Sequence, residues 1–195
     1  MSKINRFGAR KKTVTRTFRI RHEWDSVLQE EAERQGVSVN VLLNKLLRKY
    51  SLYSRWSNRN NDAAFPRQTL REILKAVQIE SLAEAGTKSG ALDAVNIANS
   101  MGLPLNYESF TYLVTEHLGG PHFARWFQCF HHTQGNKDIF HLQHDLGHKW
   151  SVFLEKYIVS FLQSMTDTET NTRVYDYAVT LEVTRPKSKP TEQQR

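Results

Sequence analysis

The most constraining feature of this sequence is a short alternating segment followed by two helical patterns, all within residues 13–50. The alternating segment, TVTRTFRIR, has one apolar face and one face of threonine and arginine, which predicts a β-strand paired from about Thr17. These 38 residues are too few to cover their own apolar surface, and a lone strand has two unpaired edges. We therefore expect two copies of the chain to share a two-stranded ribbon above four helices.

Two short helices are predicted after the strand. Acidic residues follow the strand, as is favourable at a helix N-terminus, and apolar residues recur at helical spacing until Gly36, which predicts a helix over residues 23–35. Ser38 is a favourable N-cap for the next helix. A wide apolar stripe then predicts that second helix over residues 39–50.

The sequence TFRIR, followed by a helix and then by RQGVSVNVLLNKLL, resembles the Arc/MetJ/CopG class of prokaryotic ribbon-helix-helix repressors. The resemblance covers residues 13–50 and implies a β-α-α intertwined homodimer that binds double-stranded DNA by sequence. In that family the outward side chains of the strand read bases in the major groove. The matching base-reading positions are Thr17, Arg19 and Arg21.

The resemblance also implies contacts to DNA phosphates. The family places the N-terminus of its second helix on a phosphate, which here implies backbone N–H groups of Ser38, Val39 and Asn40. The chemistry of the base-reading set agrees with DNA, because arginine bonds bidentately to guanine and threonine offers a hydroxyl and a methyl group. The basic residues predicted to contact phosphate are Arg10, Lys11, Lys12 and Arg16.

Basic charge is concentrated at one end of the chain. Residues 1–60 hold 14 Lys or Arg against 5 Asp or Glu, a net of +9, whereas residues 61–195 hold 13 against 15, a net of −2. The first 21 residues contain eight basic side chains and no acidic one, which indicates a polyanionic partner. A membrane surface is disfavoured as that partner because the basic arm lacks an apolar face.

The sequence predicts a cytoplasmic protein. It has no run of eighteen apolar residues, and its N-terminus lacks the apolar stretch of a secretory signal. Its single cysteine, Cys129, cannot form an internal disulfide, which agrees with a reducing compartment.

Five parts of the chain are expected. Residues 1–12 are a flexible basic arm, and residues 13–52 are the ribbon-helix-helix module. Residues 53–66, rich in Ser, Asn and Arg without a sustained period, are a linker. Residues 67–184 are an α+β domain for dimerisation or regulation, and residues 185–195 are a disordered tail.

The elements of the second domain follow from periodicity. Helices are predicted near residues 68–77, 81–100 and 107–118, with Gly86 and Gly90 as possible breaks in the middle one. A β-hairpin turning near Gly135 and Asn136, a helix from His148 to Met165 and a returning strand over residues 175–183 then predict a three-stranded antiparallel sheet with the long helix on one face.

Histidines cluster around this hairpin, with one cysteine among them: Cys129, His131, His132, His141 and His144. A loop over residues 133–137 would place Cys129 opposite His141, with three candidate metal ligands on one face. A tighter turn would place Cys129 opposite Leu142 instead. The spacing matches no zinc motif, so no metal ligand and no cofactor is assigned.

The sequence thus predicts a dimeric DNA-binding transcriptional regulator, in the first instance a repressor. No nucleophile elbow, phosphate-binding glycine loop, catalytic carboxylate pair or metalloprotease helix is present, so no enzymatic activity is expected. The alternatives are a plasmid partition, relaxosome or other DNA-organising factor, a metal-responsive regulator, and an antitoxin. A tetramer through the second domain and a small-molecule or metal effector both stay open.

Overall fold

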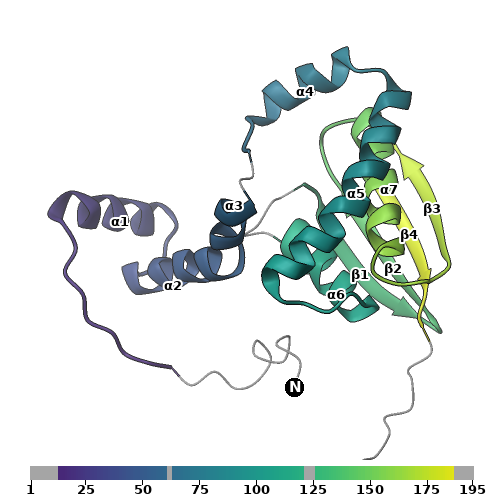
Figure 1. Cartoon of the computed structure of the whole chain (residues 1–195). Coiled ribbons are helices and arrows are strands. Elements are labelled where there is room, and N and C mark those ends of the chain that lie inside the picture. The colour runs from purple at the N-terminus through teal and green to yellow at the C-terminus, as the bar shows by residue number, and fades with distance from the viewer. Residues whose placement is uncertain (1–12, 61–62, 121–125, 187–195) are drawn as a thin grey trace, which may run out of the picture.

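The structure, a computed structural model, describes residues 13–60, 63–120 and 126–186 (Figure 1). Helices make up the first half of the chain, and the strands all follow later. The helices are α1 (His22–Arg34), α2 (Val39–Lys49), α3 (Arg55–Asn60), α4 (Arg67–Ala76), α5 (Ile79–Met101), α6 (Tyr107–Tyr112) and α7 (His148–Gln163), with π-helical segments η2 (Tyr50–Ser54) and η3 (Leu113–Leu118). The strands are β1 (Gln128–Gln134), β2 (Lys137–Gln143), β3 (Thr170–Tyr175) and β4 (Ala178–Thr184).

The predicted N-terminal strand is wrong. The first strand begins at Gln128, and residues 13–21 form an extended trace that joins no sheet (Figure 1). A β-strand exists only where a neighbouring strand accepts and donates its backbone hydrogen bonds, and within the described residues no element pairs with this segment. The ribbon-helix-helix start, and with it the predicted fold class, is therefore corrected to an extended segment followed by helices.

The two helices predicted after the segment are confirmed as α1 and α2. Gly36 ends the first of them in the left-handed region, with φ of 63°, which a residue without a side chain adopts at low cost. Ser38 caps the second, accepting a hydrogen bond from the Val41 N–H at 3.3 Å.

The first part of the predicted linker is helical. The chain passes from α2 directly into η2 and α3, where Trp56 is buried and the guanidinium groups of Arg55 and Arg59 lie 4.2 and 5.0 Å from the centre of its ring. Because this stretch buries a single large side chain, its sequence has no apolar period by which a helix could be recognised.

The sheet is antiparallel with strand order β1-β2-β4-β3, so it has four strands where three were predicted. The hairpin turn at Gly135 and Asn136 is confirmed, with Gln134 paired to Lys137. The missed strand is β3, an edge strand whose sequence TNTRVY is mostly polar and exposed or half-buried. The alternating segment from Tyr175 therefore belongs to a second hairpin, which turns at Asp176 and Tyr177.

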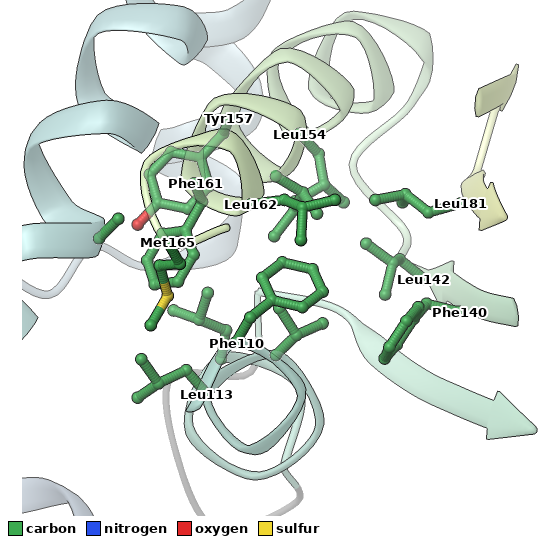
Figure 2. Close-up of a cluster of buried hydrophobic side chains, with 14 of the residues drawn as sticks. Phe110, Leu113, Phe140, Leu142, Leu154, Tyr157, Phe161, Leu162, Met165 and Leu181 are labelled. Atoms are coloured by element: carbon green, nitrogen blue, oxygen red, sulfur yellow. The ribbon is translucent and has the colours of Figure 1, made fainter. Parts of the chain in front are cut away.

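The main core lies between one face of the sheet and the helices α6, η3 and α7 (Figure 2). Phe140 and Leu142 of β2 and Leu181 of β4 point from the sheet toward α7, and Phe110 and Leu113 close the cluster from the side of α6 and η3. These five side chains are fully buried. A smaller cluster of Leu74, Leu82 and Trp150 attaches α4 to the domain.

Helix α5 is continuous through Gly86 and Gly90 and packs along α7 at very short distance. A Cβ atom added at Gly86 would lie 2.4 Å from the Phe153 carbonyl oxygen, and one added at Gly90 would lie 2.1 Å from the Tyr157 carbonyl oxygen. The buried small residues of α5 recur every fourth position: Gly86, Gly90, Ala94 and Ala98. This spacing keeps them on one helix face, which is the face that contacts α7.

We predict that Gly90→Ala lowers the free energy of unfolding by about 1 to 3 kcal/mol, because the new methyl group meets backbone that cannot move without separating the helices. Alanine has the better helix propensity, so a helix without this contact would gain stability from the change. Urea denaturation measures the difference. Asn96→Ala, on the exposed face of the same helix, should change stability little, and a Gly90→Ala protein as stable as wild type would contradict the packing argument.

Candidate functional site

The predicted base-reading residues lie on the extended segment and are exposed. Arg21 is the N-cap residue of α1, with its guanidinium carbon 5.2 Å from the centre of the Trp24 ring and Nη1 3.6 Å from Glu23 Oε1. Arg19 and Thr17 form no hydrogen bond or ion pair within the described part of the chain. Their polar groups are therefore accessible to a partner.

The predicted phosphate-contacting residues fall into two groups. Ser38, Val39 and Asn40 stand at the N-terminus of α2, whose first turn has no acidic residue, in contrast to the first turn of α1. Arg16 lies on the extended segment, with Nη1 3.5 Å from the Thr15 carbonyl oxygen. Arg10, Lys11 and Lys12 lie outside the described residues.

One chain does not bring the base-reading residues and the N-terminus of α2 together. The extended segment precedes α1 and Ser38 follows it, so the thirteen residues of that helix separate them along the chain. A helix of this length is roughly 20 Å long. A continuous DNA-binding surface over both groups would need either a partner molecule or the curvature of the DNA itself.

The strand register separates the histidine-rich hairpin into two faces. Cys129 pairs with Leu142, and His141 pairs with Phe130, so the tight turn applies and Cys129 and His141 lie on opposite faces of the sheet. Within residues 13–60, 63–120 and 126–186, no three His, Cys, Asp or Glu side chains converge in an arrangement that could hold a metal ion. The three-ligand set on which the metal-sensing alternative depended is not formed.

A serine and a histidine meet inside the domain without the geometry of a nucleophile and its base. His144 Nε2 is 2.9 Å from Ser151 Oγ, while His144 Nδ1 accepts a hydrogen bond from the Leu146 N–H at 3.3 Å. Nε2 therefore carries the proton and donates a hydrogen bond to Ser151 Oγ. The Ser151 hydroxyl in turn donates a hydrogen bond to the Asp176 carbonyl oxygen at 3.3 Å. This direction is the reverse of the one that activates a serine.

A buried carboxylate that the sequence did not single out holds three segments together. Asp138 accepts hydrogen bonds from Tyr107 Oη at 2.8 Å, Thr133 Oγ1 at 2.7 Å and Arg185 Nη2 at 3.0 Å. Burial alone raises the pKa of Asp138, but these donors outweigh it and hold that pKa well below its usual range. Only the pairing of Thr133 with Asp138 across the tight hairpin was accessible from the sequence.

Two further findings bear on the class of protein. Among the described residues, no helix has the length and apolar character needed to cross a lipid bilayer. No family model, curated protein or solved structure matches this chain. The function must therefore be argued from the residues and their arrangement.

We predict that the stability of the protein falls as the pH is lowered from about 6.5, the usual pKa of histidine, toward about 4. Burial lowers the pKa of His144 to about 4, against an opposing effect of Asp145, so in this window the unfolded chain binds a proton that the folded chain does not. Urea denaturation at a series of pH values measures the trend, and His144→Gln should remove this component of it.

His148→Gln is the control for this experiment, because that imidazole is about half exposed and lies on the neighbouring helix α7. It should keep the decline between pH 6.5 and 4. An unchanged decline in the His144→Gln protein would show that other groups cause it.

Proposed function

We propose that this chain is a cytoplasmic, sequence-selective DNA-binding regulator of transcription, in the first instance a repressor, which acts as a dimer through residues 13–52. The observation that carries the proposal is an exposed arginine-bearing segment ahead of two helices that leave most of their apolar side chains in contact with solvent. No catalytic step is part of the proposal, and the domain after residue 66 takes the role of assembly or regulation.

Electrostatics support a polyanion as the partner. The net charge of +9 over residues 1–60 stands beside −2 over the rest of the chain, and this asymmetry concentrates the positive potential at the N-terminal end, in the basic arm and the module that follows it. Double-stranded DNA gains affinity from such a module mainly through phosphate contacts and the release of counterions. The N-terminus of α2, which has no acidic residue in its first turn, is a further site where an anion can bind. The side chains of Arg48 and Lys49 add positive charge in the last turn of the same helix.

Sequence selectivity would come from the extended segment. Arginine is the side chain that most often distinguishes guanine in the major groove, because its guanidinium fork matches O6 and N7. Arg19 is the residue best placed for this role, since Arg21 already contacts Trp24 and Glu23 and Arg16 bonds to its neighbouring carbonyl. Thr17, two positions before Arg19, shares its parity along an extended chain.

The dimer follows from apolar surface that one copy leaves exposed. Among residues 13–52 only Ala32 and Leu42 are buried. The large apolar side chains of the module that are more than half exposed are Val14, Phe18, Trp24, Val27, Leu47 and Tyr50. Two buried side chains cannot offset the conformational entropy of ordering two helices. A second copy covers both apolar surfaces at once and doubles the DNA-reading groups.

Arg19→Ala should weaken binding to selected DNA sites by about 1 to 3 kcal/mol and should relax the sequence preference. Sites are first selected from a random DNA pool by the wild-type protein, and affinities are then measured by fluorescence anisotropy on selected and random duplexes. Arg19→Lys is the matched control: it keeps the charge, so it should retain affinity for random DNA while losing selectivity. Equal losses on both duplexes for Arg19→Lys would remove Arg19 from the base-reading set.

Leu47→Glu should convert the dimer to a monomer, because it places a charge in apolar surface that the second copy covers, and DNA affinity should fall with the loss of the second half-site. Sedimentation equilibrium gives the mass. Leu92→Glu is the matched control, since Leu92 on α5 is 63% exposed and Leu47 on α2 is 59% exposed. A wild-type protein that is monomeric at high concentration would contradict a dimer through this module. So would a Leu47→Glu protein that keeps the dimer mass, as the Leu92→Glu control should.

A further inference from the structure

A cavity of about 920 Å³ opens beside η3, at the end of the sheet where β1 begins and β2 finishes. Sites for small molecules have volumes of roughly 300 to 1,000 Å³. Its wall combines η3, both of these strands, the loop after β2 and the start of α4. The polar side chains that line it include Arg67, Thr115, Glu116, Gln128, Gln143 and Asp145.

The two carboxylates of the wall, Asp145 and Glu116, differ in their partners within the described chain. Arg67 forms an ion pair with Asp145, which also binds Arg71 Nη2 at 2.8 Å. Glu116 is exposed to the cavity and has no hydrogen bond or ion pair within the described residues. His144 is also in the wall, and its half-buried imidazole is neutral at pH 7 because burial lowers its pKa to about 4.

The electric field of Glu116 reaches the groups around it. Burial raises the pKa of the Cys129 thiol to about 12, with Glu116 as the second cause. Burial and then Glu116 also raise the pKa of Tyr112, one helical turn away. The thiol in the wall therefore stays protonated, and among the described residues of the wall Glu116 is the carboxylate without a cationic partner.

Several hydrogen-bonding groups of the wall are acceptors. Thr115 Oγ1 donates its proton to the Thr111 carbonyl oxygen at 2.8 Å, so it presents lone pairs to the cavity. Glu116 accepts only, and the amides of Gln128 and Gln143, paired across β1 and β2, each add a carbonyl oxygen together with an NH2 group. A ligand rich in N–H donors and positive charge matches this set.

We propose that the cavity binds a small organic cation that bears primary amine or guanidine groups, with Glu116 as its counter-ion. An anion would meet the Glu116 carboxylate directly. A neutral ligand of the same length would leave that carboxylate without a partner as the cavity loses water.

The position of η3 connects this site to the N-terminal module, and this part of the inference rests on the proposed function. On η3, His117 follows Glu116, and its ring centre is 5.6 Å from that of Tyr53 in η2. η2 continues α2 without a break, and Arg48 of α2 is close enough to Tyr112 to oppose in part the rise of its pKa. Single π-helical turns occur often at functional sites. Here η2 and η3 are in contact through Tyr53 and His117. A ligand that orders η3 therefore changes the contact that holds η2, and with it α2, against the domain.

Isothermal titration calorimetry of the full chain without DNA tests the site. The probes are 1,4-diaminobutane and agmatine, with succinate and 1,4-butanediol as an anion and a neutral molecule of the same four-carbon length. The two amines should bind, the two controls should not, and Glu116→Gln should weaken amine binding about tenfold or more. Glu169→Gln, at an exposed carboxylate after α7, should stay within about twofold of wild type.

Absence of amine binding to the wild-type chain, or equal affinity in the Glu116→Gln chain, would overturn the site. A second titration follows DNA affinity with and without 1,4-diaminobutane, and Glu116→Gln corrects for amine bound directly to DNA. A change seen in wild type alone supports coupling through η3, and an equal change in both proteins overturns it. Because the calorimetry contains no DNA, a failure of the DNA-binding proposal leaves its result intact.

Discussion

The domain after residue 66 depends on how closely α5 and α7 approach each other. Glycine at positions 86 and 90 brings the backbone of α5 against the carbonyl groups of Phe153 and Tyr157, with no space for a single methyl group. α7 can then present another face, with Leu154 and Leu162, to the sheet. α7 thereby packs against α5 on one side and against the sheet on another. A small sheet and a few helices are then sufficient for a continuous core.

Two carboxylates attach outlying segments to this core. Asp138 binds α6 through Tyr107 and the end of β4 through Arg185, and Asp145 binds two arginines of α4. Lys149 adds hydrogen bonds to the carbonyl oxygens of Lys75 and Val77 at the end of α4. The same loop that holds α4 forms part of the cavity wall, so the position of α4 and the shape of the cavity depend on one another.

The N-terminal module is physically different. It buries two apolar side chains, whereas the domain has a core of eighteen buried residues. Its link to the domain runs through η2 and α3, where Trp56 is buried and Tyr53 meets His117. A module of this kind gains its order from what it binds, which agrees with the partners that we propose for it, a second copy and DNA.

Local patterns were sufficient wherever a single segment decides its own conformation. The helices α1, α2 and α7, the Ser38 cap and the turn at Gly135 and Asn136 each follow from residues a few positions apart. The sequence missed β3 because an edge strand needs no apolar face, and it missed α3 because one buried tryptophan makes no period. Of the candidate sites, the exposed arginines were predictable from charge, while the cavity beside η3 joins segments that lie far apart in the chain.

By itself the sequence determined where α1, α2 and α7 lie, where the positive charge lies and how the hairpin turns, because these depend on neighbouring side chains and backbone sterics. Only the tertiary structure decided that residues 13–21 have no partner strand within the described chain, that Cys129 and His141 lie on opposite faces, and that Glu116 lines a cavity. Strand pairing, register and cavities are contacts between distant segments. Their free energy depends on the assembled chain, and no local pattern encodes it.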